Sequence, residues 1–327
     1  MSKFLTKFFA IREIPVGIAL VIVLGVTAFA NPAIISRSGA LDIFLGVSVV
    51  AFLAVGQTLV ITMKHVDLSV GSTIGFSAWL IGKLTADGHS LLYTIMMVLA
   101  LGLIVGALNG YLVAYLELPS LVVTLATMYI VRGVFSQISS GRTIIASEVP
   151  KPISFIGLNS LYVVPYMFIV VLVLVFVAGN IMHRLRPARD LYAIGSNLPA
   201  ANLAGIPVAK RVFSAFLANG LLASFGGVIL LSRFNAADTN SGMGLELNVI
   251  AACVVGGVAI AGGVGTVYGA LIGAILLQSI TMALGALGVG QFWQLAVNGL
   301  LLILAISLDR YLTLRVKPST IMRVKSQ

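Results

Sequence analysis

Long apolar stretches follow one another along almost the whole chain, and they constrain the fold more than any other feature. A membrane-spanning helix needs about 20 mostly apolar residues. The third and eighth stretches are short and rich in glycine and serine, so broken or re-entrant helices are expected there. The sequence therefore predicts an all-α polytopic membrane protein with about ten spans: 14–30, 43–62, 68–85, 91–116, 120–138, 162–182, 212–231, 247–262, 265–285 and 293–309.

Charge is scarce, and this excludes several classes of protein. Charged residues make up 9% of the 327 residues, whereas a soluble domain carries roughly 25%. So few charges cannot cover a globule of this size in water, which excludes a soluble enzyme, a nucleic-acid binder and a disordered chain. The single cysteine, Cys253, excludes an internal disulfide and a multi-cysteine metal site. No metal site is expected.

The basic residues predict the orientation of the chain. Ten spans place both termini on one side, and Lys and Arg accumulate in cytoplasmic loops. With both termini cytoplasmic, 14 of the 20 basic residues lie inside and Arg132 lies within a span. The remaining five lie outside: Arg37, Lys83, Arg142, Lys151 and Arg233. We therefore expect cytoplasmic N- and C-termini, and the positive charge requires no nucleic-acid partner.

The N-terminal segment has two interpretations. Lys3, Lys7 and Arg12 precede an apolar run that ends in Ala28-Phe29-Ala30. This order is typical of a signal peptide with a small-residue cleavage site. An uncleaved first helix is favoured, because removal of one span would spoil both the even count and the charge bias.

The connection 183–211 is the longest predicted cytoplasmic segment, and its middle predicts a short helix at 198–204. Asn197 is a suitable N-cap, and Pro199 is tolerated in a first turn. Gly205 suits the left-handed position after the helix. A helix of about seven residues is unstable by itself in water. It therefore docks either on the protein's own helix ends or on a cytoplasmic partner.

Three stretches together resemble one family. The 183–211 connection resembles the coupling loop of permease subunits of ribose-type bacterial ATP-binding-cassette importers. The stretch Val66-Asp67-Leu68-Ser69-Val70-Gly71-Ser72 is similar to the family's Ile-Asp-Leu-Ser-Val-Gly-Ser motif. Gly242-Met-Gly-Leu-Glu-Leu-Asn248, running into Ala251-Ala252 and Gly256-Gly257, resembles a third family segment. The resemblance extends over about 40 to 320, with its motifs in order.

The resemblance implies a single transmembrane permease domain, 1–327, in the bacterial inner membrane, with 183–211 as its cytoplasmic coupling loop. It implies a tandem ATPase subunit that carries ATP and magnesium, a periplasmic sugar-binding protein, and a second permease copy or paralogue. The substrate is a monosaccharide or a sugar-like solute. Residues implied in ATPase coupling are Gly195, Asn197, Leu198, Pro199, Ala200, Ala201, Leu203 and Gly205. The motif residues Asp67, Ser69, Gly71 and Ser72 have a structural role.

The chain departs from the family in two places. The first is Lys64-His65-Val66, where the family commonly carries Gly-Ile before Asp-Leu-Ser, and the second is the short helix of the coupling loop. Many relatives carry Glu where Leu198 stands and Arg where Asn202 stands. If polar contacts to the ATPase use those positions, this chain docks by shape and apolar contact instead.

The chain lacks its own chemistry for energy or catalysis. It contains no Gly-x4-Gly-Lys-Ser/Thr phosphate loop, so if transport is driven by ATP, the ATPase is a separate chain. Hydrolytic motifs are also missing, which predicts a transport subunit that binds no cofactor of its own and is not an enzyme. Neutral polar residues within spans suit a passage for a polyol. The candidates are Gln57, Thr58, Asn109, Thr127, Asn219, Asn248, Gln278 and Asn298.

Two other kinds of transporter remain as alternatives. One is a permease of similar architecture for nucleosides or branched-chain amino acids. The other is a self-contained secondary carrier, which would more often hold a carboxylate in mid-span. Asp67, Glu117 and Glu246 all map to span ends, which disfavours the carrier.

Glycines at four-residue spacing form two stripes, one at 102, 106 and 110 and the other at 265, 269 and 273. Such stripes allow helix backbones to approach closely in lipid. Packing within one subunit is the favoured interpretation, and a seam between two subunits is the alternative.

Overall fold

The computed structural model describes residues 13–32 and 36–290, together with scattered residues between 293 and 307, and this part is almost entirely helical. The longer helices are α2 (Glu13–Ala30), α3 (Arg37–Thr62), α4 (Val70–Ala86), α5 (Leu91–Ala114), α6 (Ser120–Ser139), α8 (Tyr166–Arg184), α11 (Val208–Phe234) and α13 (Val267–Ala286). The shorter elements are η2 (Ala146–Glu148), α7 (Lys151–Leu158), α9 (Arg186–Ser196), α10 (Leu198–Leu203) and α12 (Leu245–Val255). Strands β1 (Ser160–Leu161) and β2 (Val164–Pro165) form one small antiparallel hairpin.

The helices agree with the predicted spans in kind, and less well in their ends. Each of the first nine predicted spans coincides with a helix, and the tenth lies partly outside the described residues. Six of the described helices are long and apolar enough to cross a membrane: α3, α5, α6, α8, α11 and α13.

Two of the helix ends differ clearly from the prediction. Helix α3 begins at Arg37 rather than at 43, because the Ser36 side chain caps it by accepting from the Gly39 N–H. Helix α12 ends at Val255 rather than at 262. Gly257, Gly262 and Gly263 all have positive φ, which ends the helical conformation there.

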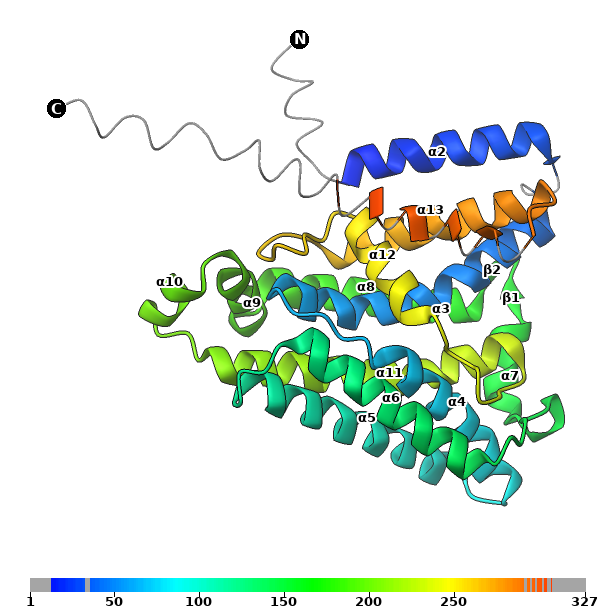
Figure 1. The fold of residues 1–327 in the computed structure, drawn as a ribbon. Coiled ribbons are helices and arrows are strands. Elements are labelled where there is room, and N and C mark those ends of the chain that lie inside the picture. The colour runs from blue at the N-terminus through cyan, green and yellow to red at the C-terminus, as the bar shows by residue number, and fades with distance from the viewer. Residues whose placement is uncertain are drawn as a thin grey trace, which may run out of the picture.

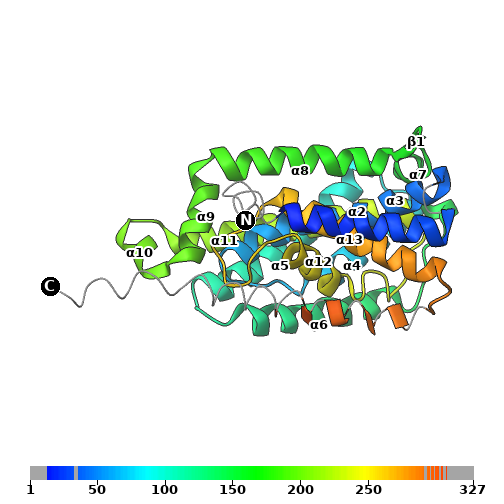
Figure 2. The same cartoon turned by 90° about the horizontal axis from the view of Figure 1, so that it is seen from above.

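The helices form a bundle with two distinct ends. Figure 1 shows α9 and α10 at one end, and α7 with β1 and β2 at the other. Seen from above in Figure 2, α8 runs along one edge of the bundle and α6 along the opposite edge. We call the two ends the α10 end and the α7 end.

The core is built around α3 and α11. These two helices are the most buried of the six span-length helices, whereas α5, α6 and α8 leave most of their apolar surface exposed. A helix that is apolar all round belongs in the interior of a bundle or in lipid. The exposed apolar faces of α5, α6 and α8 are therefore suited to contact with lipid.

Both glycine stripes pack within the subunit, as the favoured interpretation predicts. The stripe on α5 lies against α11, where a Cβ at Gly102 would overlap Ser224 and the Gly220 carbonyl. The second stripe lies against α12 and the loop after it, with Gly273 directly over the Ala252 carbonyl. Close backbone approach of this kind is what small residues allow in lipid.

Candidate translocation and coupling sites

The short helix α10 begins at Leu198 as predicted and ends at Leu203, one residue before the predicted end. The Asn197 side-chain oxygen accepts a hydrogen bond from the Ala200 N–H over 3.1 Å, which satisfies one free donor of the first turn. Pro199 lies in that turn, where its missing N–H costs nothing. Gly205 follows the helix with φ of +72°, a left-handed conformation that glycine adopts without strain.

One face of α10 is buried and the other is exposed. Ala201 is buried and packs into an apolar cluster with Val60 and Phe216. Leu203, by contrast, is 92% exposed, and Leu198 is 45% exposed. The Ala201 face therefore docks on the protein's own helices, whereas Leu203 presents an apolar side chain outside the bundle.

Helix α9, which the sequence did not predict, fixes α10 to the bundle. Gly195 packs so closely on the Thr62 carbonyl that a Cβ would overlap it. The Tyr192 hydroxyl donates to the Gly265 carbonyl over 2.9 Å. Burial raises the pKa of Tyr192, so its hydroxyl remains a donor. Asp190 pairs with Arg211 over 2.9 Å. Through these contacts α9 and α10 are linked to the ends of α3, α11 and α13.

The predicted structural motif forms a buried hydrogen-bond network around Asp67. One carboxylate oxygen accepts from the Ser69 N–H at 2.9 Å and from its hydroxyl at 2.6 Å. The other accepts from the Asn219 amide at 2.9 Å. The Asn109 amide donates to the Ser69 hydroxyl at 2.9 Å. The network therefore ties the segment before α4 to α5 and α11.

The depth of Asp67 corrects the sequence analysis, which placed this residue at a span end. Asn219 is the twelfth residue of α11, so its partner Asp67 lies about 16 Å along that helix at 1.5 Å per residue. Asp67 does precede a helix, but α4 begins inside the bundle and not at its surface. A buried carboxylate is therefore present within the bundle, and the argument against a secondary carrier from its absence was wrong.

The start of α12 also lies inside the bundle, and it faces the start of α4. A Cβ at Gly71 would overlap the Glu246 carboxylate and approach the Gly242 carbonyl at 2.9 Å. Ser72 secures the first turn of α4 by donating to the Ser69 carbonyl at 2.9 Å. Helices α4 and α12 thus begin side by side inside the bundle and run to opposite ends of the molecule.

Arg132 joins these two starting points. Its guanidinium donates to the Thr239 and Ser241 carbonyls, each at 2.9 Å, and to the Gly71 carbonyl at 3.4 Å. The charge on α6 is therefore satisfied by carbonyls of the loop before α12. Arg132 holds this loop against α4, which accounts for an arginine within a predicted span.

The structure divides the predicted path residues into two groups. The first group is buried in helix contacts: Gln57, Thr58, Asn109, Thr127 and Asn219. In this group Thr58 donates to the Ala54 carbonyl at 2.6 Å, and Gln57 reaches the backbone of Asp67. The second group is Asn248 and Gln278, which line a small cavity of about 90 Å³ between α3, α12 and α13. Asn298 lies outside the described residues.

Larger cavities lie at the α7 end. One of about 440 Å³ is lined by Asp42 of α3, Arg233 of α11, and Gln278 and Thr281 of α13. Another of about 410 Å³ is lined by Arg233 and by the loop that leads to α12, including Asp238 and Asn240. Asp42, Arg233 and Thr281 were not among the predicted path residues. They stand near the ends of three separate helices, and nothing in the sequence brings them together.

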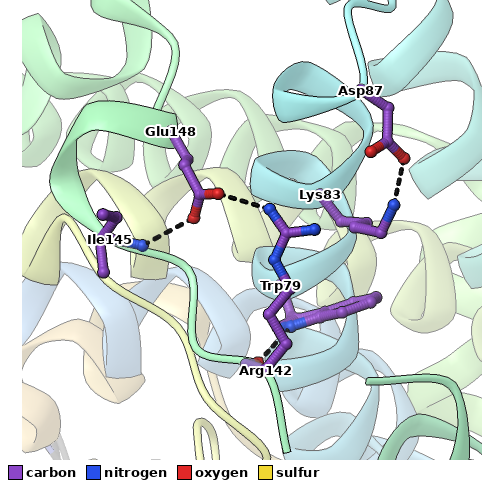
Figure 3. A network of polar contacts seen from close by, with 6 residues as sticks. All are labelled: Trp79, Lys83, Asp87, Arg142, Ile145 and Glu148. Atoms are coloured by element: carbon purple, nitrogen blue, oxygen red, sulfur yellow. Dashed lines mark hydrogen bonds and ion pairs between the residues drawn. The ribbon is translucent and has the colours of Figure 1, made fainter. Parts of the chain in front are cut away.

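In a second polar cluster at the α7 end, the charged side chains are paired with one another and do not line a cavity (Figure 3). Arg142 pairs with Glu148, and Lys83 pairs with Asp87. The Trp79 indole donates to the Arg142 carbonyl at 2.8 Å. The pKa of Glu148 lies below its ordinary value, first because the Ile145 N–H donates to its carboxylate and then because of Arg142. These contacts fasten the loop after α6 onto α4.

The described residues hold no group of three or more His, Cys, Asp or Glu side chains that could bind a metal ion. Cys253 is buried in the core, where burial makes a thiol inert. The polar side chains within the bundle serve helix contacts or line cavities. This arrangement of span-length helices, cavities and a protruding short helix defines a membrane transport subunit.

The chain belongs to the family described as branched-chain amino acid transport system / permease component, whose model matches residues 39–306. It is accordingly a multi-pass protein of the inner membrane.

Several curated relatives cover most of this chain. An autoinducer 2 import system permease protein of Enterobacter sp. (strain 638) is 34% identical over 298 residues, covering 91% of this chain and 86% of its own length. An L-arabinose ABC transporter permease protein of Azospirillum brasilense is 35% identical, covering 82% and 79%. A ribose import permease protein of Escherichia coli (strain K12) is 32% identical, covering 89% and 92%. No solved structure matches the chain.

Proposed function

We propose that the chain is the permease subunit of an ATP-driven importer for a monosaccharide or a sugar-like solute. The observation that carries this proposal is α10, a capped helix of six residues that holds Leu203 outside the bundle. The names of the three relatives support a sugar-like solute, because each relative is named for the import of such a compound. The chain has no phosphate loop, so ATP and magnesium bind to a separate ATPase subunit.

The α10 end faces the cytoplasm in this proposal, with ten spans and both termini on that side. Six described basic residues lie at this end: Lys64, Arg184, Arg186, Arg189, Lys210 and Arg211. The sequence assigns the basic residues of both termini to the same side, as positively charged cytoplasmic loops require. The α7 end then faces the periplasm, where a sugar-binding protein docks.

The coupling residues act by position in this proposal. Leu198, Pro199, Ala200 and Leu203 lie on the exposed side of α10 and meet the ATPase, while Ala201 and Gly195 fix the helices to the bundle. When ATP closes the ATPase pair, the motion passes from α10 to α9. It then reaches α3, α11 and α13 through the Gly195, Asp190 and Tyr192 contacts. A second permease copy or a paralogue completes the passage.

Two glycines allow a matched test of the coupling helix. Gly205 follows α10 with φ of +72°, and Gly88 follows α4 at the α7 end with φ of +87°. Neither has any atom near the place of a Cβ, so valine introduces the same backbone strain at both sites. We expect Gly205→Val to abolish ATP-dependent uptake while the protein still inserts into the membrane. Gly88→Val should retain uptake, and wild-type uptake by Gly205→Val would refute coupling through α10.

The alternatives are separated by the same assay. A secondary carrier would take up its solute in cells that lack the ATPase gene, whereas the importer would not. The buried Asp67 is a carboxylate of the kind that a carrier would use, but both of its oxygens already accept hydrogen bonds, from Ser69 and from Asn219. Labelled leucine and a labelled nucleoside test the other two substrate classes.

A further inference from the structure

Three cavities at the α7 end share lining residues and form a track into the bundle. The 410 Å³ cavity shares Arg233 and Phe234 with the 440 Å³ cavity. The 440 Å³ cavity in turn shares Gln278 and Thr281 with the 90 Å³ cavity at Asn248. The track therefore begins at the loop before α12 and ends beside α12, between α3 and α13. We call its middle part, lined by Asp42, Arg233, Gln278 and Thr281, the vestibule.

The vestibule holds two opposite charges that do not touch. Asp42 and Arg233 line the same cavity and interact electrostatically. Among the described residues neither side chain donates or accepts a hydrogen bond, and no ion pair joins them. The guanidinium instead lies over the Phe234 ring, 4.7 Å from its centroid. Their hydrogen-bonding groups are consequently free for a solute.

Two other charge pairs at this end are in direct contact, unlike Asp42 and Arg233. Lys83 and Asp87 are in contact, as are Arg142 and Glu148, and no volume separates either pair (Figure 3). Long side chains at a protein surface readily reach such partners when geometry permits. In the vestibule α3 and α11 hold the carboxylate and the guanidinium apart across 440 Å³.

A glycine provides room for the amide in the vestibule wall. A Cβ at Gly46 would overlap the Gln278 side-chain amide. The amide of Gln278 therefore lies against the α3 backbone and lines both the 440 Å³ and the 90 Å³ cavities. Thr281 adds a hydroxyl one turn further along α13, although it also donates to the Leu277 carbonyl at 3.0 Å.

We propose that the vestibule receives the solute, and that the solute is an uncharged polyol held between Asp42 and Arg233. This inference rests on the proposed function and specifies the site at which its substrate enters. A carboxylate accepts from sugar hydroxyls and a guanidinium donates to them, and both bonds are strengthened by the charge. The neutral amide and hydroxyl of Gln278 and Thr281 continue the same exchange of hydrogen bonds toward Asn248.

The test uses cells that contain the permease with its ATPase and binding protein, supplied with labelled D-ribose or L-arabinose. Asp42→Asn and Arg233→Gln remove one charge each at nearly constant size. Loss of a charge-assisted hydrogen bond should lower uptake efficiency about tenfold. Asp87→Asn, in a closed pair at the same end, should stay within about twofold of the wild type. ATPase capture and sugar binding by the binding protein should be unchanged.

Each other outcome has a definite meaning. Uptake within about twofold of the wild type for both vestibule variants overturns the site. If the wild type imports labelled leucine but neither sugar, and the variants lose leucine uptake, the vestibule binds a zwitterion and the polyol assignment is wrong.

A separate measurement covers the case in which no probe is imported and the proposed function itself fails. Thr281→Cys is treated with a membrane-impermeant thiol reagent, and the native Cys253 gives little background because it is buried. Labelling from the external medium supports an open vestibule. Absence of labelling overturns it independently of transport.

Discussion

Asp67 and Asp42 are chemically identical residues in opposite surroundings. Asp67 is 1% exposed and accepts three hydrogen bonds that join the segment before α4 to α11. Asp42 is exposed, has no hydrogen-bond partner among the described residues, and lines a cavity opposite Arg233. Polarity within a bundle therefore does not by itself mark a solute path. In the proposed site, by contrast, the carboxylate of Asp42 and the guanidinium of Arg233 lie beside free volume.

The largest loss of stability should come from replacing Asp67, whose carboxylate is buried and hydrogen-bonded. Asp67→Ala leaves the Asn219 amide and the Ser69 hydroxyl buried without an acceptor, and each such group costs about 1–3 kcal/mol. We expect a large fall in Tm in detergent and little folded protein. Asp42→Ala should keep the wild-type Tm because no bond is lost. Equal Tm shifts for the two alanine variants would contradict the claim that Asp67 is bonded in the folded protein and Asp42 is not.

A glycine contact tests how tightly the helices pack around Asn219, the partner of Asp67. Gly56 lies against Asn219, where a Cβ would overlap the amide oxygen and approach the Asn219 Cα at 3.2 Å. Gly56→Ala should therefore cost about 1–3 kcal/mol through overpacking. Gly133→Ala in α6 is the control, because nothing lies within 4 Å of its Cβ position. Thermal unfolding of both variants measures the difference, and a stable Gly56→Ala would contradict the tight packing at Asn219.

Substitutions in the two groups of predicted path residues should affect different properties, stability in the first group and uptake in the second. Asn109→Ala removes the bond to Ser69 and should lower Tm, with uptake reduced in proportion to the folded protein. Asn248→Ala alters a cavity wall, and we expect uptake per folded molecule to fall severalfold at unchanged Tm. Quantitative immunoblots of the membrane fraction supply the normalisation. A lower Tm for Asn248→Ala, together with unchanged uptake per folded molecule, would show that Asn248 serves a helix contact like the first group of path residues.

The smallest effect should come from Glu148, whose side chain is only partly exposed. The pKa of this carboxylate is lowered in the folded state, so its contribution is present above the ordinary pKa and is lost as the pH falls through the folded value. Glu148→Gln should have a slightly lower Tm than the wild type at neutral pH. The two Tm values should converge in acid. A difference that grows on acidification would contradict the sign of this shift.

The sequence predicts the fold correctly where neighbouring residues determine the structure, as in apolar spans and helix caps. Apolar runs located the spans, and the residues Asn197 and Gly205 defined the ends of α10 correctly. Helix α9 escaped prediction because it contains Gly195, a poor helix former by itself. The tight contact of Gly195 with Thr62 needs glycine there, and this tertiary reason is invisible in the local sequence.

The candidate site was predictable only in part. Asn248 and Gln278 line a cavity, but the same rule also selected Gln57 and Asn219, which are closed in helix contacts. Hydropathy places a residue along a span without showing whether a neighbour satisfies it. Asp42 and Arg233 are distant in sequence, and only the packing of α3 against α11 and α13 brings them to one cavity.

The most direct test of the central claim is a gentle detergent pull-down of the tagged protein from its native membranes, followed by mass spectrometry. The account predicts a tandem ATPase subunit in near-equal amount. Leu203→Asp, which changes the exposed apolar side chain of α10, should lose that subunit, whereas Leu158→Asp on α7 should keep it. If no ATPase follows the wild-type protein even after mild cross-linking, α10 is not a coupling helix and a self-contained carrier becomes the better account.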